Sequence, residues 1–197
     1  MTAGASFRRL QGSERGSAVI EFAVAAPVLL LLLIGIYDMA HRAYLTAILH
    51  GAVEEASRQD GLEIADNTKA DAYVTAMVQR VAPGATVTFK RSSYYDFADL
   101  KRAETWNDKN ANGKCDNGES YTDENRNGQW DADIGTSDNG GGNDVVLYTA
   151  TVTYTPVFIV PFVSNSTSQR TLTASTVRKN QPYALQEKYG SDAGTCS

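Results

Sequence analysis

The residues best suited to chemistry in this sequence are oxygen-bearing side chains at alternate positions of two short polar runs. The first run, residues 108–119, satisfies the pattern D-x-[DN]-x-[DN]-G-x5-E at every specified position. Calcium is held by about six to eight oxygens, which a tight loop supplies from alternate side chains, one backbone carbonyl and a closing glutamate. The first run therefore predicts a calcium site with the ligands Asp108, Asn110, Asn112, the Lys114 carbonyl, Asp116 and Glu119.

The second run begins 15 residues later and repeats the first half of the pattern. Its twelfth position is Ile134, and an acidic residue stands one place earlier. The closing ligand of the second loop therefore stays open, and Glu119 is an alternative that could serve a second ion. The candidate ligands are Asp123, Asn125, Asn127, the Gln129 carbonyl, Asp131 and Asp133.

The two runs are too close together to leave room for a helix between them, which excludes an EF-hand pair. They are more similar to the calcium repeats of dockerin-like or thrombospondin-like proteins. The alternative is a disordered Gly/Asn/Asp-rich insertion, and the tandem repetition favours calcium over it. Trp106, Tyr121 and Trp130 flank the runs, and we expect them to pack together once the metal orders the segment.

The charge of the chain is concentrated around these runs. Residues 104–144 hold ten acidic and three basic side chains, so the net charge of this segment is −7. The whole chain has a net charge of −5, so the remaining residues have a net charge of +2. Without a basic face, the chain is not expected to bind nucleic acid. Two cysteines exclude a disulfide-dense scaffold, but an extracytoplasmic location would permit a disulfide between Cys115 and Cys196.

Recognisable catalytic motifs are absent from the sequence. His41 and His50 are nine residues apart on one predicted helix, so they cannot converge on a metal. No nucleophile elbow, phosphate-binding loop, dinucleotide fingerprint or zinc-protease motif occurs. We therefore expect that the protein is not an enzyme.

The other extreme of the sequence is an apolar run at residues 18–36, which contains one charge, Glu21. As a helix rising about 1.5 Å per residue, this run is long enough to cross a bilayer. Arg8, Arg9 and Arg15 precede it, so the N-terminus is expected to stay in the cytoplasm and residues after Tyr37 to lie outside. A cleaved signal peptide fits poorly, because Asp38 would lie three residues before a cut after Ala40.

The start of the span, Gly16-Ser17-Ala18-Val19-Ile20-Glu21-Phe22, resembles the processing site of type IV pilin-like precursors. The wider stretch, from Arg15 to about Gln59, resembles TadE-like proteins, the pseudopilins of the Flp/Tad pilus system, and residues 175–182 resemble the family's ending more weakly. The resemblance implies that a prepilin peptidase cuts after Gly16, and that the new amino group of Ser17 in one subunit pairs with Glu21 of a neighbour. The alternative is an uncleaved signal anchor that tolerates Glu21.

The elements that must position these residues follow from periodicity. The apolar spacing predicts one helix over residues 18–59, stopped by Asp60-Gly61 and open to a kink at Pro27, and a second helix over 67–81. Alternation predicts antiparallel strands at 85–90, 145–155 and 168–177, and the apolar residues 157–160 could cover a sheet edge. This is an α+β fold, and the resemblance implies a pilin-like one.

The predicted organisation is a leader (1–16), a transmembrane helix (17–37) and an extracytoplasmic domain (38–197) with the calcium insertion at 94–143. The resemblance implies a minor pseudopilin in the bacterial inner membrane or on the pilus. Its expected partners are a prepilin peptidase, other pilins and the pilus assembly machinery. The alternative function is that of an uncleaved, membrane-anchored envelope protein whose calcium loop serves adhesion or ligand binding.

Overall fold

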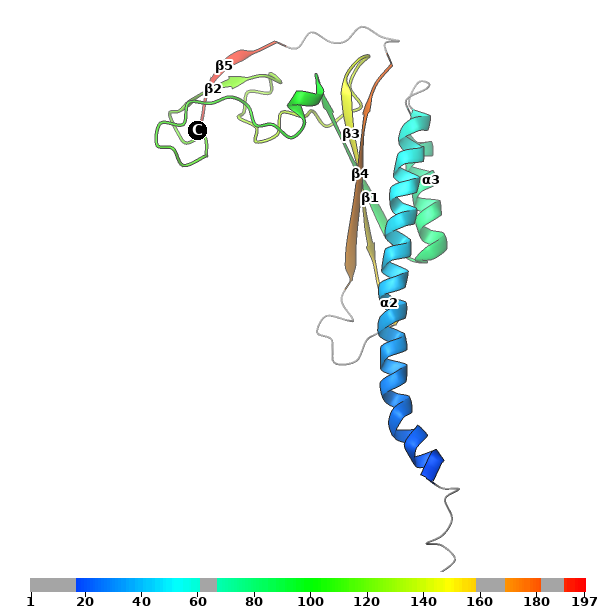
Figure 1. Ribbon diagram of the computed structural model, residues 1–197. Coiled ribbons are helices and arrows are strands. Elements are labelled where there is room, and N and C mark those ends of the chain that lie inside the picture. Colours follow the sequence, from blue (N-terminus) through cyan, green and yellow to red (C-terminus); the bar gives the residue numbers. More distant parts are fainter. Residues whose placement is uncertain (1–16, 61–66, 159–168, 182–189) are drawn as a thin grey trace, which may run out of the picture. The chain divides into compact units, whose positions relative to one another are not determined.

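The computed structural model describes residues 17–60, 67–158, 169–181 and 190–197 (Figure 1). The chain divides into two compact units. The first comprises residues 1–44 and 155–169, and the second comprises residues 45–154 and 170–197. Helix α2, Ser17–Asp60, begins in the first unit and ends in the second.

In the first unit, α2 exposes a continuous apolar surface. Large side chains along residues 19–36 are exposed, and Val19 and Phe22 are each 69% accessible. Pro27 lies inside the helix, and the helical conformation continues through it. This helix is long and apolar enough to cross a membrane. Tyr37 contacts Phe158 edge to face, with ring centroids 5.1 Å apart; residues 159 and 160 of the same apolar connection lie outside the described residues.

The second unit contains helix α3, Asn67–Val81, and a three-stranded antiparallel sheet. The strands are β1 (Thr86–Tyr94), β3 (Val145–Tyr154) and β4 (Arg170–Lys179), in the order β1-β3-β4. The register pairs Tyr94 with Val145 and Val145 with Lys179. The long N-terminal helix, the second helix and the small antiparallel sheet confirm the predicted α+β class.

The core of the second unit forms where the C-terminal part of α2, the helix α3 and the sheet place apolar residues on one face. Residues four apart on each helix fall on the same side, so Leu45 and Leu49 of α2 and Val74 and Val78 of α3 are fully buried. The strands contribute alternate residues, as a pleated surface requires. The buried sheet residues of this cluster are Tyr148, Ala150, Val152, Tyr154, Leu172 and Ala174.

A partly buried ion pair joins α3 to the sheet. Arg91 of β1 donates two hydrogen bonds to the Asp71 carboxylate, at 2.6 and 3.1 Å, and the Tyr148 hydroxyl donates a third at 2.7 Å. The guanidinium also lies 4.5 Å from the centre of the Tyr148 ring. Such a bidentate contact fixes orientation as well as distance.

The strand boundaries differ from the predicted ones at the polar end of β1. This strand continues through Tyr94, where residues 91–94 pair with residues 145–148 of β3. The sequence predicts that the strand ends at residue 90, because the alternation of apolar residues stops at Arg91, Ser92 and Ser93. The insertion therefore begins after Tyr94.

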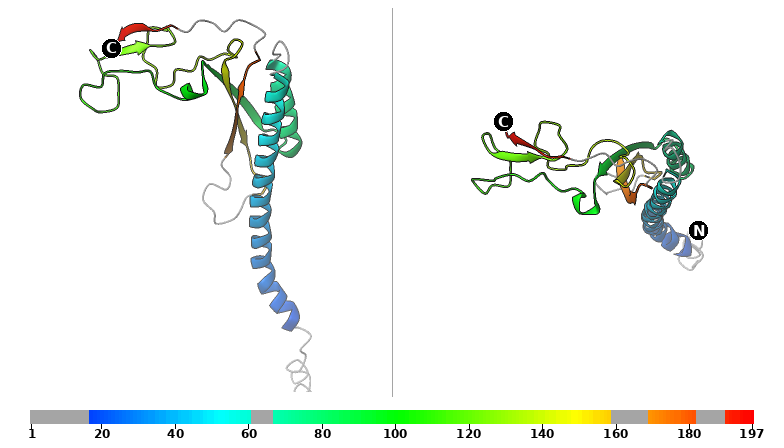
Figure 2. Two further views of the ribbon diagram at one scale, coloured as in Figure 1. Left: turned by 45° about the horizontal axis from the view of Figure 1, so that its top comes forward. Right: turned by 90° about the horizontal axis from the view of Figure 1, so that it is seen from above.

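The insertion contains structure that no pattern in the sequence predicts. A single 3₁₀ turn covers Phe97–Asp99, and β2 (Ser120–Asp123) pairs antiparallel with β5 (Asp192–Thr195). Figures 1 and 2 show these two strands side by side. Gly194 faces Tyr121 across the pair, and a Cβ at Gly194 would clash with the tyrosine ring.

Shortening a core side chain of α2 should destabilise the second unit. Leu49→Ala leaves a cavity among α3 and the sheet, so we expect a loss of about 2–5 kcal/mol in the free energy of unfolding. Urea titration of the full chain in detergent, followed by circular dichroism, measures it. Glu54→Ala, at an exposed position of the same helix, is the matched control, and equal loss in both variants would contradict the packing described above.

Candidate metal centre

The two polar runs begin at equivalent positions of a short antiparallel pairing. The Asn107 amide donates to the Ser120 carbonyl, and the Thr122 amide donates to the Thr105 carbonyl, both at 2.8 Å. Trp106 and Tyr121 form the bridge between these bonds. Since Asp108 and Asp123 each follow two residues after the bridge, the two loops leave the pairing in the same way.

In the first loop, side-chain oxygens accept hydrogen bonds from the loop's own backbone. Asp108 accepts from the amides of Asn112 and Gly113, at 3.1 and 2.8 Å. The Asn110 oxygen accepts from the Asn112 amide at 3.1 Å, and the Asn112 oxygen from the Lys114 amide at 2.9 Å. The turn requires a positive φ at Gly113 (+75°), a conformation that glycine adopts without steric cost.

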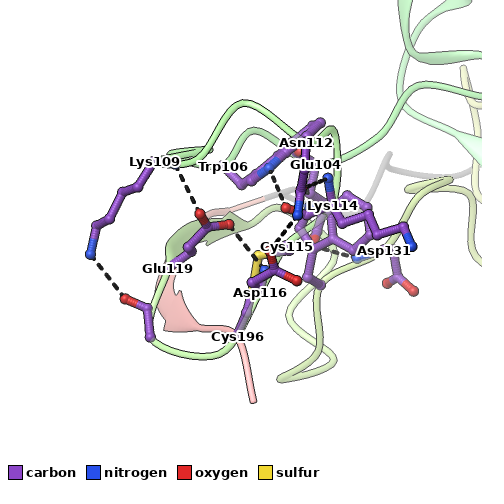
Figure 3. Close-up of a disulfide and its surroundings, with 12 residues drawn as sticks. Glu104, Trp106, Lys109, Asn112, Lys114, Cys115, Asp116, Glu119, Asp131 and Cys196 are labelled. Atoms are coloured by element: carbon purple, nitrogen blue, oxygen red, sulfur yellow. Dashed lines mark hydrogen bonds between the residues drawn. A yellow bond between two sulfur atoms is a disulfide. The ribbon is translucent and has the colours of Figure 1, made fainter.

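The same side chains converge on Asp116. Its Oδ2 atom accepts hydrogen bonds from the side-chain Nδ2 atoms of Asn110 and Asn112, at 2.7 and 2.6 Å. These hydrogen bonds, that from Asn110 first, lower the pKa of the Asp116 carboxyl. Glu119 closes the loop by accepting from the Lys109 amide at 2.9 Å and the Asp116 amide at 3.0 Å (Figure 3).

The second loop repeats this network position by position. Asp123 accepts from the amides of Asn127 and Gly128, at 3.1 and 2.7 Å, and Asn127 accepts from the Gln129 amide at 2.7 Å. The asparagine at the third position accepts from the Asn127 amide at 3.1 Å. Asp131 Oδ2 accepts hydrogen bonds from the side-chain Nδ2 atoms of both asparagines, Asn125 and Asn127, at 2.7 and 2.5 Å.

The closing position of the second loop is filled from upstream in the chain. Glu104 accepts from the Glu124 amide at 2.7 Å and from the Asp131 amide at 3.0 Å. These amides correspond to those of Lys109 and Asp116, which Glu119 binds in the first loop. Glu104 therefore occupies the closing position of the second loop, for which the sequence did not identify a residue.

The acidic residue near the end of the second run lies elsewhere. The Asp133 carboxylate accepts from the Tyr94 hydroxyl and from the Gly135 amide, both at 3.1 Å. Burial, followed by the contact with Asp133, raises the pKa of the Tyr94 phenol. Ile134 packs into a small apolar cluster with Tyr94, Val145 and Leu147.

Glu104 is positioned by contacts made by its neighbours. The Glu104 amide donates to the Asp131 carbonyl at 2.9 Å, and the Ile134 amide donates to the Arg102 carbonyl at 2.9 Å. Arg102 binds Asp99 and Glu124 through ion pairs of 2.9 and 2.6 Å. The hydrogen bonds with Arg102 are the main reason that the pKa of the Glu124 carboxyl is lowered.

The burial and charge of the two loops suit a cation. Glu104, Glu119 and Asp123 are 0, 4 and 5% exposed, and within the described residues none of them forms an ion pair with a basic side chain. Burial raises the pKa of the Tyr121 phenol, and the negative charges of Asp123, Glu104 and Asp131 raise it further. Buried carboxylates normally require a compensating positive charge.

The asparagine amides determine how a cation would fit. In the described parts of the chain, no three Asp, Glu, His or Cys side chains gather as a ready-made metal cluster. Instead, the aspartate at the ninth position of each loop, Asp116 or Asp131, accepts hydrogen bonds from the side-chain amide nitrogens of two asparagines. A half-turn of an amide exchanges its nitrogen and oxygen, so each loop can direct asparagine, aspartate, glutamate and carbonyl oxygens inward, the set that calcium prefers.

Two tryptophans link the loops. Trp106 and Trp130 contact edge to face, with ring centroids 5.2 Å apart. The Trp106 indole donates to the Lys114 carbonyl at 3.2 Å, and the Trp130 indole donates to the Glu104 carbonyl at 3.2 Å. A carbonyl oxygen has two lone pairs, so Lys114 keeps one for a metal.

A disulfide attaches the C-terminal strand to the first loop. Cys115 and Cys196 are bonded, with Cα atoms 5.8 Å apart and a sequence separation of 81 residues (Figure 3). Backbone hydrogen bonds support the link, from the Gly118 amide to the Cys196 carbonyl at 2.9 Å and from the Cys196 amide to the Glu119 carbonyl at 2.8 Å. The disulfide therefore holds the residue that closes the first loop.

Only part of the predicted processing site lies within the described residues. Gly16 lies outside the described residues. Ser17 is the first residue of α2, and Glu21 and Phe22 lie on its exposed apolar part.

Breaking the disulfide should loosen the insertion. A cross-link across this many residues typically contributes about 2–4 kcal/mol, so we expect the double variant Cys115→Ser/Cys196→Ser to unfold at a lower temperature than the oxidised wild type. Differential scanning calorimetry of the full chain in detergent measures the shift. Reductant should lower the wild-type midpoint without affecting the double variant, and an unchanged wild-type midpoint would contradict the contribution.

Comparison with known proteins assigns a similarity to the N-terminal segment. Residues 16–58 match the family described as TadE-like protein. No curated protein and no solved structure matches the chain. The matched segment contains Gly16, Glu21 and almost all of α2, so the chain is similar to TadE-like proteins along its apolar helix, which suggests a protein associated with the Tad pilus.

Proposed function

We propose that this protein is a minor pseudopilin of a Flp/Tad-type pilus, anchored in the bacterial inner membrane through α2. The observation that carries the proposal is the family match at residues 16–58, because it covers both the glycine–glutamate motif and the apolar helix. The exposed apolar side chains along residues 19–36 support packing against lipid or against the helices of other pilins.

In this proposal, a prepilin peptidase cuts after Gly16 on the cytoplasmic side. The mature chain then begins at Ser17, the first residue of α2, and Glu21 is its fifth residue. The new amino group of one subunit pairs with Glu21 of its neighbour at the same membrane depth. An ionisable side chain within an apolar span is costly, and such a pairing offsets that cost.

The second unit lies outside the membrane and carries the insertion, which calcium stabilises. The support is the repeated oxygen network of the two loops and their buried carboxylates. Partners of the assembled protein are other pilins and the assembly machinery of the pilus.

Processing can be tested at the glycine. We expect the mature protein to begin at Ser17, and Gly16→Ala to accumulate only as the precursor, because the peptidase recognises the residue before the cut. N-terminal sequencing of the protein from membranes measures both. Gly35→Ala, a glycine with open space around it inside α2, should be processed normally. A wild-type chain that begins at Met1 would contradict the proposal and favour an uncleaved, membrane-anchored adhesion protein.

Calcium should stabilise the folded insertion by mass action. At a free calcium concentration about 100 times the dissociation constant, one site contributes about 2.7 kcal/mol, so the thermal midpoint of the full chain in detergent should rise. Asp108→Ala removes the first ligand of the first loop and should reduce the rise.

The matched control is Asp96→Ala, which removes an exposed carboxylate from the insertion but from neither loop. It should respond to calcium like the wild type. The calcium proposal is wrong if millimolar calcium does not change the wild-type midpoint, or if Asp108→Ala responds fully.

A further inference from the structure

We propose that Glu104 is the closing calcium ligand of the second loop, so that the two loops form one two-ion unit with exchanged glutamates. This inference rests on the proposed calcium binding and goes beyond it, because it assigns a ligand that the loop pattern does not contain. Glu119 leads into the second loop and closes the first, whereas Glu104 leads into the first loop and closes the second.

The sequence repeat supports this assignment when each copy is taken to begin at its glutamate, four residues before the first aspartate of the loop. Residues 104–118 and 119–133 then form two 15-residue copies. Both copies have glutamate at the first position, an aromatic residue at the third and the loop aspartate at the fifth. The later loop residues also coincide, with asparagine at the seventh and ninth positions, glycine at the tenth and aspartate at the thirteenth.

The geometry supports it independently of the repeat. Both glutamates use their two oxygens to accept from the amides of the second and ninth loop positions, at 2.9 and 3.0 Å for Glu119 and 2.7 and 3.0 Å for Glu104. Each carboxylate therefore spans its loop from one side to the other. Glu104 reaches the second loop because Trp106 and Tyr121 bring the two copies together in antiparallel pairing.

Burial and charge indicate that this carboxylate needs a cation. Glu104 is 0% exposed, and its side-chain oxygens accept only from neutral backbone amides among the described contacts. Arg102, the nearby basic residue, pairs with Asp99 and Glu124 instead. A buried carboxylate without a cation is costly, and two backbone amides alone do not compensate for removing a full charge from water.

A purely structural role for Glu104 is the competing explanation. Glutamine is similar in size and keeps one of the two acceptors, its carbonyl oxygen, so a folded variant retains one of the two backbone hydrogen bonds. Glutamine cannot, however, bind calcium through two carboxylate oxygens. The number of bound ions therefore separates the two roles.

The test is equilibrium dialysis of the full chain in detergent against radioactive calcium. We expect two ions per wild-type chain and one for Glu104→Gln at a concentration that saturates the wild type. Asp133→Asn is the matched control, since this carboxylate contacts Tyr94 and Gly135 rather than the loop, and it should keep two ions.

Double variants identify which ion is lost. Asp131→Asn removes the ninth-position ligand of the second loop, so combining it with Glu104→Gln should still leave one ion. Asp116→Asn removes the corresponding ligand of the first loop, so combining that change with Glu104→Gln should leave none. Circular dichroism and an intact disulfide verify folding. If Glu104→Gln does not fold, Glu104→Asp replaces it and should weaken one of two sites by about tenfold or more.

The outcomes separate this inference from the proposal beneath it. Two ions in folded Glu104→Gln, or one ion in both this variant and the wild type, would overturn the exchanged closing ligand and leave calcium binding intact. No bound calcium in the wild type would remove the calcium proposal and this inference with it. The pseudopilin assignment would stand in every case, because it rests on the N-terminal helix.

Discussion

The pairing of Tyr94 with Val145 is the constraint on which the insertion depends. These two residues are register partners at the end of β1 and the start of β3, so the 50 residues between them must leave and re-enter the sheet at one place. Closing a loop of this length costs conformational entropy. The chain offsets that cost inside the insertion, through backbone hydrogen bonds, a small apolar cluster around Tyr94 and Ile134, and the disulfide.

Within the insertion, order comes from polar groups rather than from a hydrophobic core. The two loops have the same hydrogen-bond network, and the two tryptophans contact each other edge to face and donate to backbone carbonyls. Carboxylates such as Glu104 and Glu119 are as buried as core residues. An insertion stabilised in this way is sensitive to its ionic surroundings, whereas the sheet and the two helices are stabilised by apolar packing.

The sequence predicts best where one physical signal dominates. The second helix, Asn67–Val81, matches the predicted range because its apolar spacing, its N-terminal Asn67 and the following Pro83-Gly84 agree. The C-terminal end of β1 and the strand β5 were not predicted, because Arg91–Ser93 and Asp192–Thr195 carry little strand propensity and are held by their partners. The contact of Glu104 with the second loop was not predicted, because the calcium-loop pattern includes only residues after the first aspartate. The position of Glu104, 15 residues before Glu119, was nevertheless visible in the sequence.

The hydrogen bond between the Glu104 amide and the Asp131 carbonyl, 2.9 Å long, has a consequence for how such a segment is acquired. It brings the first residue of the first copy next to the ninth position of the second loop, so residues 104–131 begin and end at one point. A hairpin of a sheet therefore supplies enough room for its attachment, and the strands of the sheet keep their register. The segment cannot be transferred alone, however, because Cys115 is bonded to Cys196 and β2 pairs with β5, which lie in the C-terminal part of the chain.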